Sequence, residues 1–428
     1  MARKMKDSGI EWIGEIPEGW EVLAHKYIMH KEKSICEHYS GEDVISLTLN
    51  GVVKRDLENP SGKMPTTFDG YQFVDPNDLL LCLFDIDVTP RCVGLVKDYG
   101  VTSPAYSRFK IHSGFCNAFY NYLLRFIDDE KVFVHLSKNL RSSLTESDFG
   151  AIKTIVPPKA EQQRIADYLD NRTFEIDTLS SKARSSIEEY KKLKQAVITQ
   201  AVTKGVRGER EMKDSGVEWI GKIPKEWSVS PMKHFIDILP GYAFSSDDFC
   251  IEEGIPLLRG INVGVNEIRW DETVRWNHSI SKQLESFFLK ENDLVVGLDR
   301  PWISDGTRVA FIAKKDLPCL LLQRVCRIRT RCNFDIRWIY YWLSGSSFKD
   351  SLSTETTGIS VPHISTKQIE QFIVAFPNLL EQTQVCNYLD AKCAEIDKLI
   401  AKKEQLVKEL ESYKKSLIYE VVTGKREV

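Results

Sequence analysis

Long apolar runs are missing from this sequence. No stretch of its 428 residues approaches the roughly 18 consecutive apolar residues of a membrane-spanning helix. The first residues, MARKMKDSGIEW, include basic side chains but no apolar region and no small-residue cleavage site, so we expect no secretory signal. The ten cysteines form no Cys-x-x-Cys pair and no zinc-like spacing with histidine. We therefore expect reduced, mostly buried thiols in a cytoplasmic protein without a membrane partner.

Motifs for catalysis are also missing. There is no GxxxxGK[ST] nucleotide loop, no GxSxG elbow, no HExxH zinc motif and no glycine-rich dinucleotide loop after a strand. An Asn/Asp-Pro-Pro-Tyr/Phe segment, which would hold a flipped base in an amino-methyltransferase, is absent too. The FDID segment, Phe84–Asp87, brings two carboxylates together but lacks a Glu-x-Lys companion. We expect no catalytic residue, no metal site and no cofactor.

Charge of one sign is not in excess. Lysine and arginine number 58, aspartate and glutamate 61, and the formal net charge is −3. This balance excludes a protein coated in positive charge, but not DNA binding, because a local basic cluster can neutralise a few phosphates. A hydrophobic content of 42% and a charged content of 28% are typical of a soluble globular protein, and the length suits two or three domains.

The chain repeats itself at long range. MKDSGIEWIGEIPEGW (residues 5–20) returns as MKDSGVEWIGKIPKEW (residues 212–227), with twelve of sixteen positions identical. EQQRIADYLDNRTFEIDTL (161–179) returns as EQTQVCNYLDAKCAEIDKL (381–399). The offset grows from 207 to 220, so the second middle stretch is 13 residues longer, and the two middles are not recognisably alike apart from their last stretches. The pattern predicts duplication of a whole domain together with a shared frame.

Each repeat ends in a long amphipathic segment. Apolar residues alternate at steps of four and three, without proline, over about 40 residues, which predicts a helix about 60 Å long. We expect the two helices to pair with each other as an antiparallel coiled coil, since a stripe this long needs a partner. The predicted seam residues are Ile165, Leu169, Ile176, Leu179, Ile187, Leu193 and Val197, and Val385, Leu389, Ile396, Leu399, Leu406, Leu410 and Leu417.

The middles read as mixed α/β domains, which gives an α+β fold class with a pseudo-twofold internal repeat. Short β-branched runs such as DLLLCLF (78–84) and DLVVGL (293–298) are bounded by turn residues. The aromatic patches at 115–126 and 335–345 are typical of core helices. The predicted divisions are a tryptophan segment (1–21), a first domain (22–157), a helix (158–205), a second tryptophan segment (206–227), a second domain (228–376) and a second helix (377–428).

At this point the pattern resembles the specificity (S) subunits of type I restriction-modification enzymes. The resemblance covers nearly the whole chain and rests on the duplicated tryptophan segments, on PPKAEQQRIADYLD and PNLLEQTQVCNYLD, and on GISVPHIS before the last strand. It implies two target recognition domains, each reading one half of a bipartite site in double-stranded DNA. It further implies that the helix pair sets the half-site spacing and docks two methyltransferase subunits, through which restriction subunits join. One departure is that residues 138–145, opposite GISVPHIS, lack its glycine and proline.

Loops that mix turn residues with arginine, asparagine and hydroxyls carry the candidate DNA contacts, because such side chains read base edges or hold phosphates. The candidates are Asn50, Lys54, Arg55, Lys63 and Arg91 in the first domain, and Arg259, Asn262, Arg300, Trp302, Arg308, Thr357 and Gly358 in the second. Two alternatives stay open. One is a stand-alone nuclease or methyltransferase that uses the acids of Phe84–Asp87, and the other is a protein-binding scaffold without a role on DNA.

Overall fold

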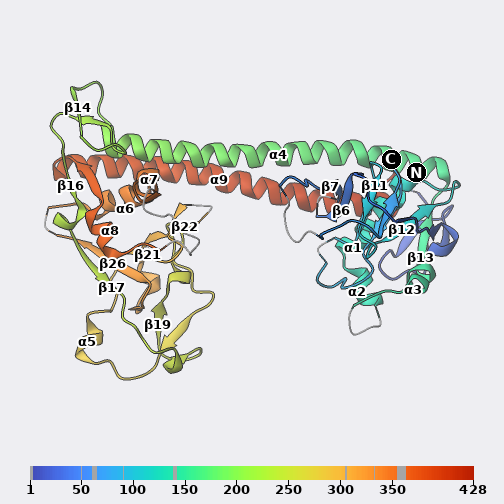
Figure 1. Cartoon of the computed structure of the whole chain (residues 1–428), viewed down its shortest axis with the longest axis horizontal. Helices are drawn as coiled ribbons and strands as arrows, with labels where there is room; N and C mark the ends of the chain where they lie inside the picture. Colours follow the sequence, from blue (N-terminus) through green and yellow to red (C-terminus); the bar gives the residue numbers. More distant parts are fainter. Residues whose placement is uncertain are drawn as a thin grey trace. The chain divides into compact units, whose positions relative to one another are not determined.

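The computed structural model divides the chain into two compact units (Figure 1). The first consists of Met1–Arg184 with Glu404–Val428, and the second of Ser185–Lys403. The structure describes residues 3–49, 51–59, 65–89, 91–137, 142–303, 306–331, 333–353 and 363–428. Within these ranges no helix is both long and apolar enough to cross a membrane. The α+β class expected from the sequence is confirmed, with strands and short helices in each unit and two long helices.

The first unit holds two main sheets, of strand order β10-β9-β12-β4 and β5-β8-β11-β6-β7, and a neck formed by β3 and β13. Its strands are β1 (Met5–Asp7), β2 (Glu15–Pro17), β3 (Glu21–Ala24), β4 (Met29–Lys31), β5 (Ile35–Cys36), β6 (Val44–Thr48), β7 (Gly51–Lys54), β8 (Tyr71–Val74), β9 (Leu79–Leu81), β10 (Val93–Leu95), β11 (Gly100–Thr102), β12 (Ser107–Ile111) and β13 (Lys153–Val156). Its helices are η1 (His25–Tyr27), α1 (Asn117–Asp129), α2 (Val132–Leu136), α3 (Glu146–Ala151) and the first part of α4 (Lys159–Lys204).

The second unit repeats this plan with sheets of order β24-β21-β26-β17 and β18-β20-β19-β25 and a neck formed by β16 and β27. Its strands are β14 (Met212–Asp214), β15 (Lys222–Pro224), β16 (Ser228–Pro231), β17 (Ile236–Pro240), β18 (Phe249–Cys250), β19 (Ile255–Leu258), β20 (Val274–Trp276), β21 (Leu294–Gly297), β22 (Trp302–Ile303), β23 (Gly306–Thr307), β24 (Val309–Phe311), β25 (Leu320–Leu321), β26 (Val325–Thr330) and β27 (Ile373–Phe376). Its helices are η2 (Met232–His234), η3 (Ser246–Asp248), η4 (Gly260–Asn262), α5 (Lys282–Glu285), η5 (Lys314–Asp316), α6 (Ile336–Ser344), α7 (Ser346–Ser353), α8 (Thr366–Gln371) and the first part of α9 (Leu379–Val422).

The two middles, which look unlike in sequence, have one topology. The order β10-β9-β12-β4 corresponds strand by strand to β24-β21-β26-β17, and the parallel pair β6–β11 returns as β19–β25. The turns that lead into β9 and β21 match in detail: Asn77 and Asn292 have φ angles of 76° and 67°. The carboxylates of Asp78 and Asp293 each accept a hydrogen bond of 2.7 Å from the amide three residues earlier. The sequence comparison missed this likeness of the middles, whose shared signature is Asn-Asp-Leu-x-x-x-Leu.

The first tryptophan segment packs against the end of α9. Trp20 is 1% exposed, and its indole donates to the Glu161 carboxylate at 3.0 Å. Arg3 stacks over the Trp20 ring at 5.5 Å and pairs with Glu161 at 2.7 Å. Gly424 ends α9 with a φ of +72°, and a Cβ added there would meet Pro17 at 2.6 Å. A glycine is therefore needed at this helix end, both for its left-handed backbone and for the close approach.

The second tryptophan segment packs in a similar way at the end of α4, although the Trp227 indole does not repeat the hydrogen bond of Trp20 with a glutamate. Trp227 is 1% exposed, and Arg210 stacks over its ring at 5.4 Å. Arg210 pairs with the buried carboxylate of Glu381 at 2.6 Å. Gly205 ends α4 with a φ of +75°, and a Cβ added there would meet the Arg210 guanidinium. Each unit thus contains the first part of one long helix and the last part of the other. The first unit holds the start of α4 and the end of α9, and the second unit holds the start of α9 and the end of α4.

The repeated Glu-Gln pair at the start of each long helix has a structural role. The side chain of Gln162 accepts a hydrogen bond from the Cys116 amide and donates one to the Pro157 carbonyl, both at 2.8 Å. Gln382 accepts from the Asp335 amide and donates to the carbonyl of the proline five residues before it, both at 3.0 Å. Each glutamine therefore ties the start of a long helix to the start of α1 or α6.

Within each unit the two long helices pack antiparallel. In the first, Ile165, Leu169 and Ile176 of α4 share a core with Leu417 of α9. In the second, Ile198 of α4 shares a core with the first turns of α9. Of the predicted seam, Ile165, Leu169, Ile176, Ile187, Val385, Leu389, Ile396 and Leu417 are buried, and Val197 and Leu410 are partly buried.

The remaining four predicted seam residues are exposed: Leu179, Leu193, Leu399 and Leu406. The contact stripe passes through the next residue instead, which is Ser180, Lys194, Ile400 or Val407. Lys194 lies on it and pairs with Asp397 at 2.7 Å, and Lys414 pairs with Asp177 at 2.6 Å. The lysine stems cover the partner helix while their ammonium groups reach an acid, so a rule that counts apolar residues alone assigns the wrong register there.

The nine described cysteines are all free thiols, and all but Cys250 are buried. Burial raises the pKa of the Cys393 thiol to about 11 and that of Cys319 to about 12. These thiols are therefore packing residues rather than nucleophiles.

His25 gives the first domain a stability that depends on pH. It occupies the place of Met232 in the second unit, is fully buried, and its ring Nδ1 lies 3.2 Å from the Phe149 carbonyl. Burial lowers its pKa to about 4, although the hydrogen bond with Phe149 partly opposes this. Since the unfolded chain binds a proton near pH 6.5 and the folded chain does not, stability is lost as the pH falls from about 6.5 to 4.

We expect His25→Met to remove this loss, because the second unit already accommodates methionine there. Denaturant unfolding of both proteins between pH 7 and pH 4 measures the effect. As the pH falls from 7 to 4, the free energy of unfolding of the variant should rise relative to that of the wild type by on the order of 3 kcal/mol. Two curves that run parallel across the range would show that the buried imidazole is not the cause.

Candidate functional site

The described residues contain no group of three histidine, cysteine, aspartate or glutamate side chains that could hold a metal ion. The acids of the Phe84–Asp87 segment, Asp85 and Asp87, are both exposed on a turn between β9 and β10. A nuclease or methyltransferase based on this segment is not supported. The surfaces that remain are loops at the edges of the sheets.

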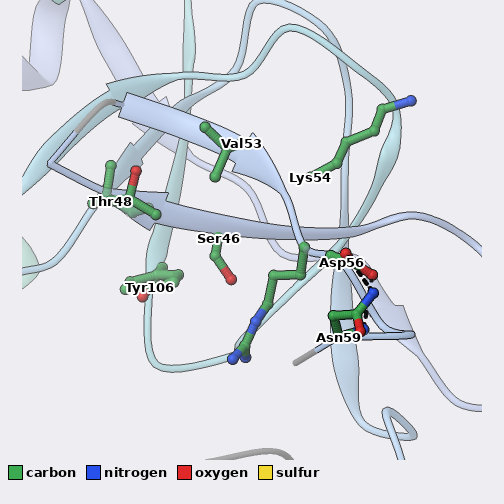
Figure 2. Close-up of a pocket in the computed structure, with 9 residues that line it drawn as sticks. Ser46, Thr48, Val53, Lys54, Asp56, Asn59 and Tyr106 are labelled. Atoms are coloured by element: carbon green, nitrogen blue, oxygen red, sulfur yellow. Dashed lines mark hydrogen bonds between the residues drawn. The ribbon is translucent and has the colours of Figure 1, made fainter. Parts of the chain in front are cut away.

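A cavity of about 380 Å³ lies beside the β6–β7 hairpin of the first unit. Ser46 and Thr48 of β6, Val53 of β7 and Tyr106 of the turn before β12 line it (Figure 2). At one end Asp56 and Asn59 are joined by hydrogen bonds from the Asn59 amides to the Asp56 carboxylate (Figure 2). The remaining lining residues are Leu47, Lys54, Arg55, Asp56 and Asn59. The cavity therefore combines hydroxyls, an amide and two cations, which are groups that hydrogen-bond to nucleic acid, with one carboxylate, that of Asp56.

Two predicted first-domain contacts lie at this cavity. Lys54 is about half exposed and pairs with Asp43 at 2.7 Å, and Arg55 lies among the lining residues. Arg91 is elsewhere: its side chain is 12% exposed and pairs with Asp129 at 3.0 Å. This burial suits a support for the loop better than a contact with DNA. Four of the predicted contacts lie outside the described residues: Asn50, Lys63, Thr357 and Gly358.

In the second unit Arg308 and Asn262 are engaged within the protein. The Arg308 guanidinium donates to the carbonyls of Val263, at 2.8 Å, and of Gly260 and Asp299. Asn262 is 2% exposed, and its side-chain amide is hydrogen-bonded to main-chain groups of its own loop. Both residues therefore hold the segment after β19 in place rather than facing outward.

The other predicted contacts of the second unit are closer to the surface. Arg259 donates to the Glu272 carbonyl. Trp302 is partly buried against Phe348, with ring centroids 6.1 Å apart. Arg300 is exposed, and its φ of 45° lies in the left-handed region. Arg300 thus lies in the connection between β21 and β22, with its side chain accessible.

The hairpin that carries Arg300 has a counterpart in the first unit. Residues 77–85 align without a gap to residues 292–300, with Leu83 opposite Leu298. The carbonyl of Leu83 accepts a hydrogen bond from the Leu144 amide at 2.8 Å, and that of Leu298 accepts one from the Ile364 amide at 2.9 Å. The loop between β9 and β10 and the loop between β21 and β24 therefore occupy equivalent positions. We call them the first and second tip loops, residues 83–92 and 298–308.

The sequence did not single out three residues at the base of the second tip loop. The carboxylate of Asp299 lies 2.6 Å from His363 Nδ1 and 3.6 Å from the Arg324 guanidinium. These side chains come from three separated segments, so only the strand pairing brings them together. Burial lowers the pKa of Arg308 nearby, and the charges of Arg269 and Arg300 lower it further. The charges of Arg269, Arg300 and Arg308 are thus close enough to interact.

Part of the chain is similar to a known family. Residues 224–409 match the family described as type I restriction modification DNA specificity domain. The chain is 31% identical over 278 residues to the type I restriction enzyme MjaVIII specificity subunit of Methanocaldococcus jannaschii. This alignment covers 65% of this chain and 63% of that protein. It is 34% identical over 179 residues to the EcoAI specificity subunit of Escherichia coli, covering 42% and 30%. The chain thus spans less than two thirds of the length of either relative.

Solved structures share the fold. One, described as the structural basis of complex assembly and conformational transition of the type I R-M system, has a TM-score of 0.71 at 15% identity. The alignment covers 96% of this chain and 99% of that one. The HsdS subunit of Thermoanaerobacter tengcongensis has a TM-score of 0.50 at 16% identity, covering 96% and 98%. At these identities the likeness concerns the fold.

Proposed function

We propose, from the premise that the chain belongs to the family of type I restriction-modification specificity subunits, that it reads a bipartite site on double-stranded DNA and has no catalysis of its own. Each middle domain reads one half of the site. The long helices α4 and α9 set the spacing between the halves. A cytoplasmic location is part of this proposal, because the DNA that it reads lies there.

The observation that supports the proposal best is that the two units share one topology but differ in the sequences of their loops. The strands, the neck and the tryptophan segments correspond between the units, whereas the loops that follow β6 and β19, and the two tip loops, differ in sequence. A constant frame with variable loops is what two readers of different half-sites need, since specificity lies in the side chains that meet base edges.

Within those loops we propose a division of labour. Lys54, Arg55, Arg259, Arg300 and Trp302 contact DNA, together with the predicted contacts that lie outside the described residues. Arg91, Asn262 and Arg308 support the loops, as their buried hydrogen bonds and ion pairs indicate.

The long helices supply the surface for partner proteins. Several large apolar side chains on them are exposed, including Phe174 at 73% and Leu380 at 68%. Apolar side chains on a helix that faces outward favour contact with another protein. We propose that two methyltransferase subunits bind there and that restriction subunits join through them.

The proposal is tested with the purified chain, the methyltransferase subunit of the same host, and their complex. With S-adenosylmethionine and duplex DNA, only the complex should transfer methyl groups, at sites that share a bipartite sequence. Its binding should weaken steeply with salt, because phosphate contacts release counterions. Cleavage or methylation by the chain alone would favour the stand-alone enzyme, and a complex that does not bind DNA would favour the scaffold.

A further inference from the structure

The two tip loops share an unusual backbone conformation at one position. Asp85 and Arg300 correspond in the gapless alignment of residues 77–85 with 292–300, and their φ angles are 46° and 45°. Neither residue is glycine, so each accepts a left-handed conformation that L-residues seldom adopt, arginine even less often than aspartate. Strain of this kind is retained where a side chain must be aimed, and here it is retained at the same place in both units.

The same position carries opposite chemistry. Asp85 is an acceptor with a negative charge, and Arg300 is a donor with a positive charge. Both are exposed, and no described residue forms a hydrogen bond or an ion pair with either side chain. We propose that Asp85 and Arg300 are the equivalent base-reading residues of the two domains, Asp85 for a cytosine and Arg300 for a guanine.

The pairing follows from the hydrogen-bonding groups that bases present in the major groove. Guanine offers two acceptors, O6 and N7, to the guanidinium fork, whereas cytosine offers the N4 amino group to a carboxylate. An exposed carboxylate is repelled by phosphates, so Asp85 is better suited to a base edge than to the DNA backbone. Asp85, one of the two acids of Phe84–Asp87 first considered for catalysis, is thereby assigned to recognition.

The loop backbones are held firmly enough to aim these side chains. The Asp85 carbonyl accepts hydrogen bonds from the amide and the hydroxyl of Thr89, at 2.9 and 2.8 Å, and the Ile86 amide donates to the Ser142 carbonyl at 3.0 Å. Beside Arg300, the Arg308 amide donates to the Pro301 carbonyl at 2.7 Å. Each reading residue thus projects from a loop tied to its own domain by main-chain hydrogen bonds.

This assignment rests on the proposed function and is tested by Asp85→Asn and Arg300→Asn in the complex with the methyltransferase subunit. Asparagine tolerates the left-handed backbone, so neither variant should melt below the wild type, and it prefers adenine. Sequencing of methylated positions should show one base changing from cytosine toward adenine in Asp85→Asn and one from guanine toward adenine in Arg300→Asn. The two changes should fall in different half-sites, each with a roughly 5- to 150-fold loss of methylation at the original sequence.

Asp87→Asn, in the same loop, and Arg331→Asn, an exposed arginine outside both loops, serve as controls and should leave the motif unchanged. If the wild-type complex shows no bipartite motif, the proposed function itself fails. If the wild-type complex shows a bipartite motif, three results would overturn the assignment. The Asp85→Asn and Arg300→Asn variants could keep the wild-type motif, or they could lower methylation without changing a base preference. The third result is that both variants change the same half-site.

Discussion

Glu381→Ala should destabilise the second unit by about 3–5 kcal/mol. The Glu381 carboxylate is almost fully buried and pairs with Arg210, whose own side chain is only 13% exposed and stacks on Trp227. Without Glu381 the desolvated Arg210 guanidinium keeps only one acidic partner, the half-exposed Glu226 carboxylate at 2.7 Å, and a buried charge that loses its buried partner costs more than the pair contributes. For a unit of this size the melting temperature should fall by about 10 °C or more, as calorimetry would measure.

The matched control is Glu395→Ala on the same helix. Glu395 pairs with Lys392 at 2.9 Å, but both side chains are about half exposed or more, so its loss should leave the melting temperature almost unchanged. The double variant of Glu381 and Arg210 to alanine should be less destabilised than the sum of the single variants, because no unpaired charge remains. Equal losses from the two glutamate variants would show that the repeated Arg-Trp-Glu contact does not stabilise the unit.

The parts of the fold that could be predicted are those with a local signature. The helices α4 and α9 were visible because an apolar stripe repeats along one segment and proline is missing from it. Their seam register was harder: Lys194 and Lys414 lie in the seam because acids on the other helix neutralise them, and no pattern of one segment contains that information. The exposed side chain of Leu193, next to Lys194, is the consequence.

The common topology of the middles could not be predicted by comparing them, because strand pairing joins distant segments and accepts almost any β-branched or aliphatic sequence. The turn before β9 and the matching turn before β21 do share a sequence, Asn-Asp. The left-handed backbone of Asn77 and Asn292, and the carboxylate of the next residue that accepts a hydrogen bond, require these residue types. The roles of loop residues depend in the same way on distant partners. Arg308, for example, is a predicted DNA contact, and its hydrogen bonds to the carbonyls of Val263 and Gly260 are visible only in the structure.

Replacing residues 21–156 by residues 228–376 should convert the recognition site entirely. The exchange joins equivalent points, since each segment begins with the first neck strand and ends with the last, β3 and β13 in one unit and β16 and β27 in the other. The tryptophan segments and the long helices stay in place, so the frame is unchanged. The chain would then carry the second domain twice, and we expect a symmetric site made of two inverted copies of the second half-site. Preference for the original first half should fall by several orders of magnitude, because each mismatched base pair costs about 1–3 kcal/mol.

The methylation map of the wild-type and exchanged chains, each expressed with the methyltransferase subunit in the same cells, tests the central claim most directly. For the wild type the account predicts a bipartite motif of two different half-sites separated by a fixed number of unspecified base pairs. For the exchanged chain it predicts the same gap flanked by two inverted copies of one wild-type half-site. A motif that is continuous, or one that changes in both halves or in neither, would contradict the claim that each domain reads one half-site from a common frame.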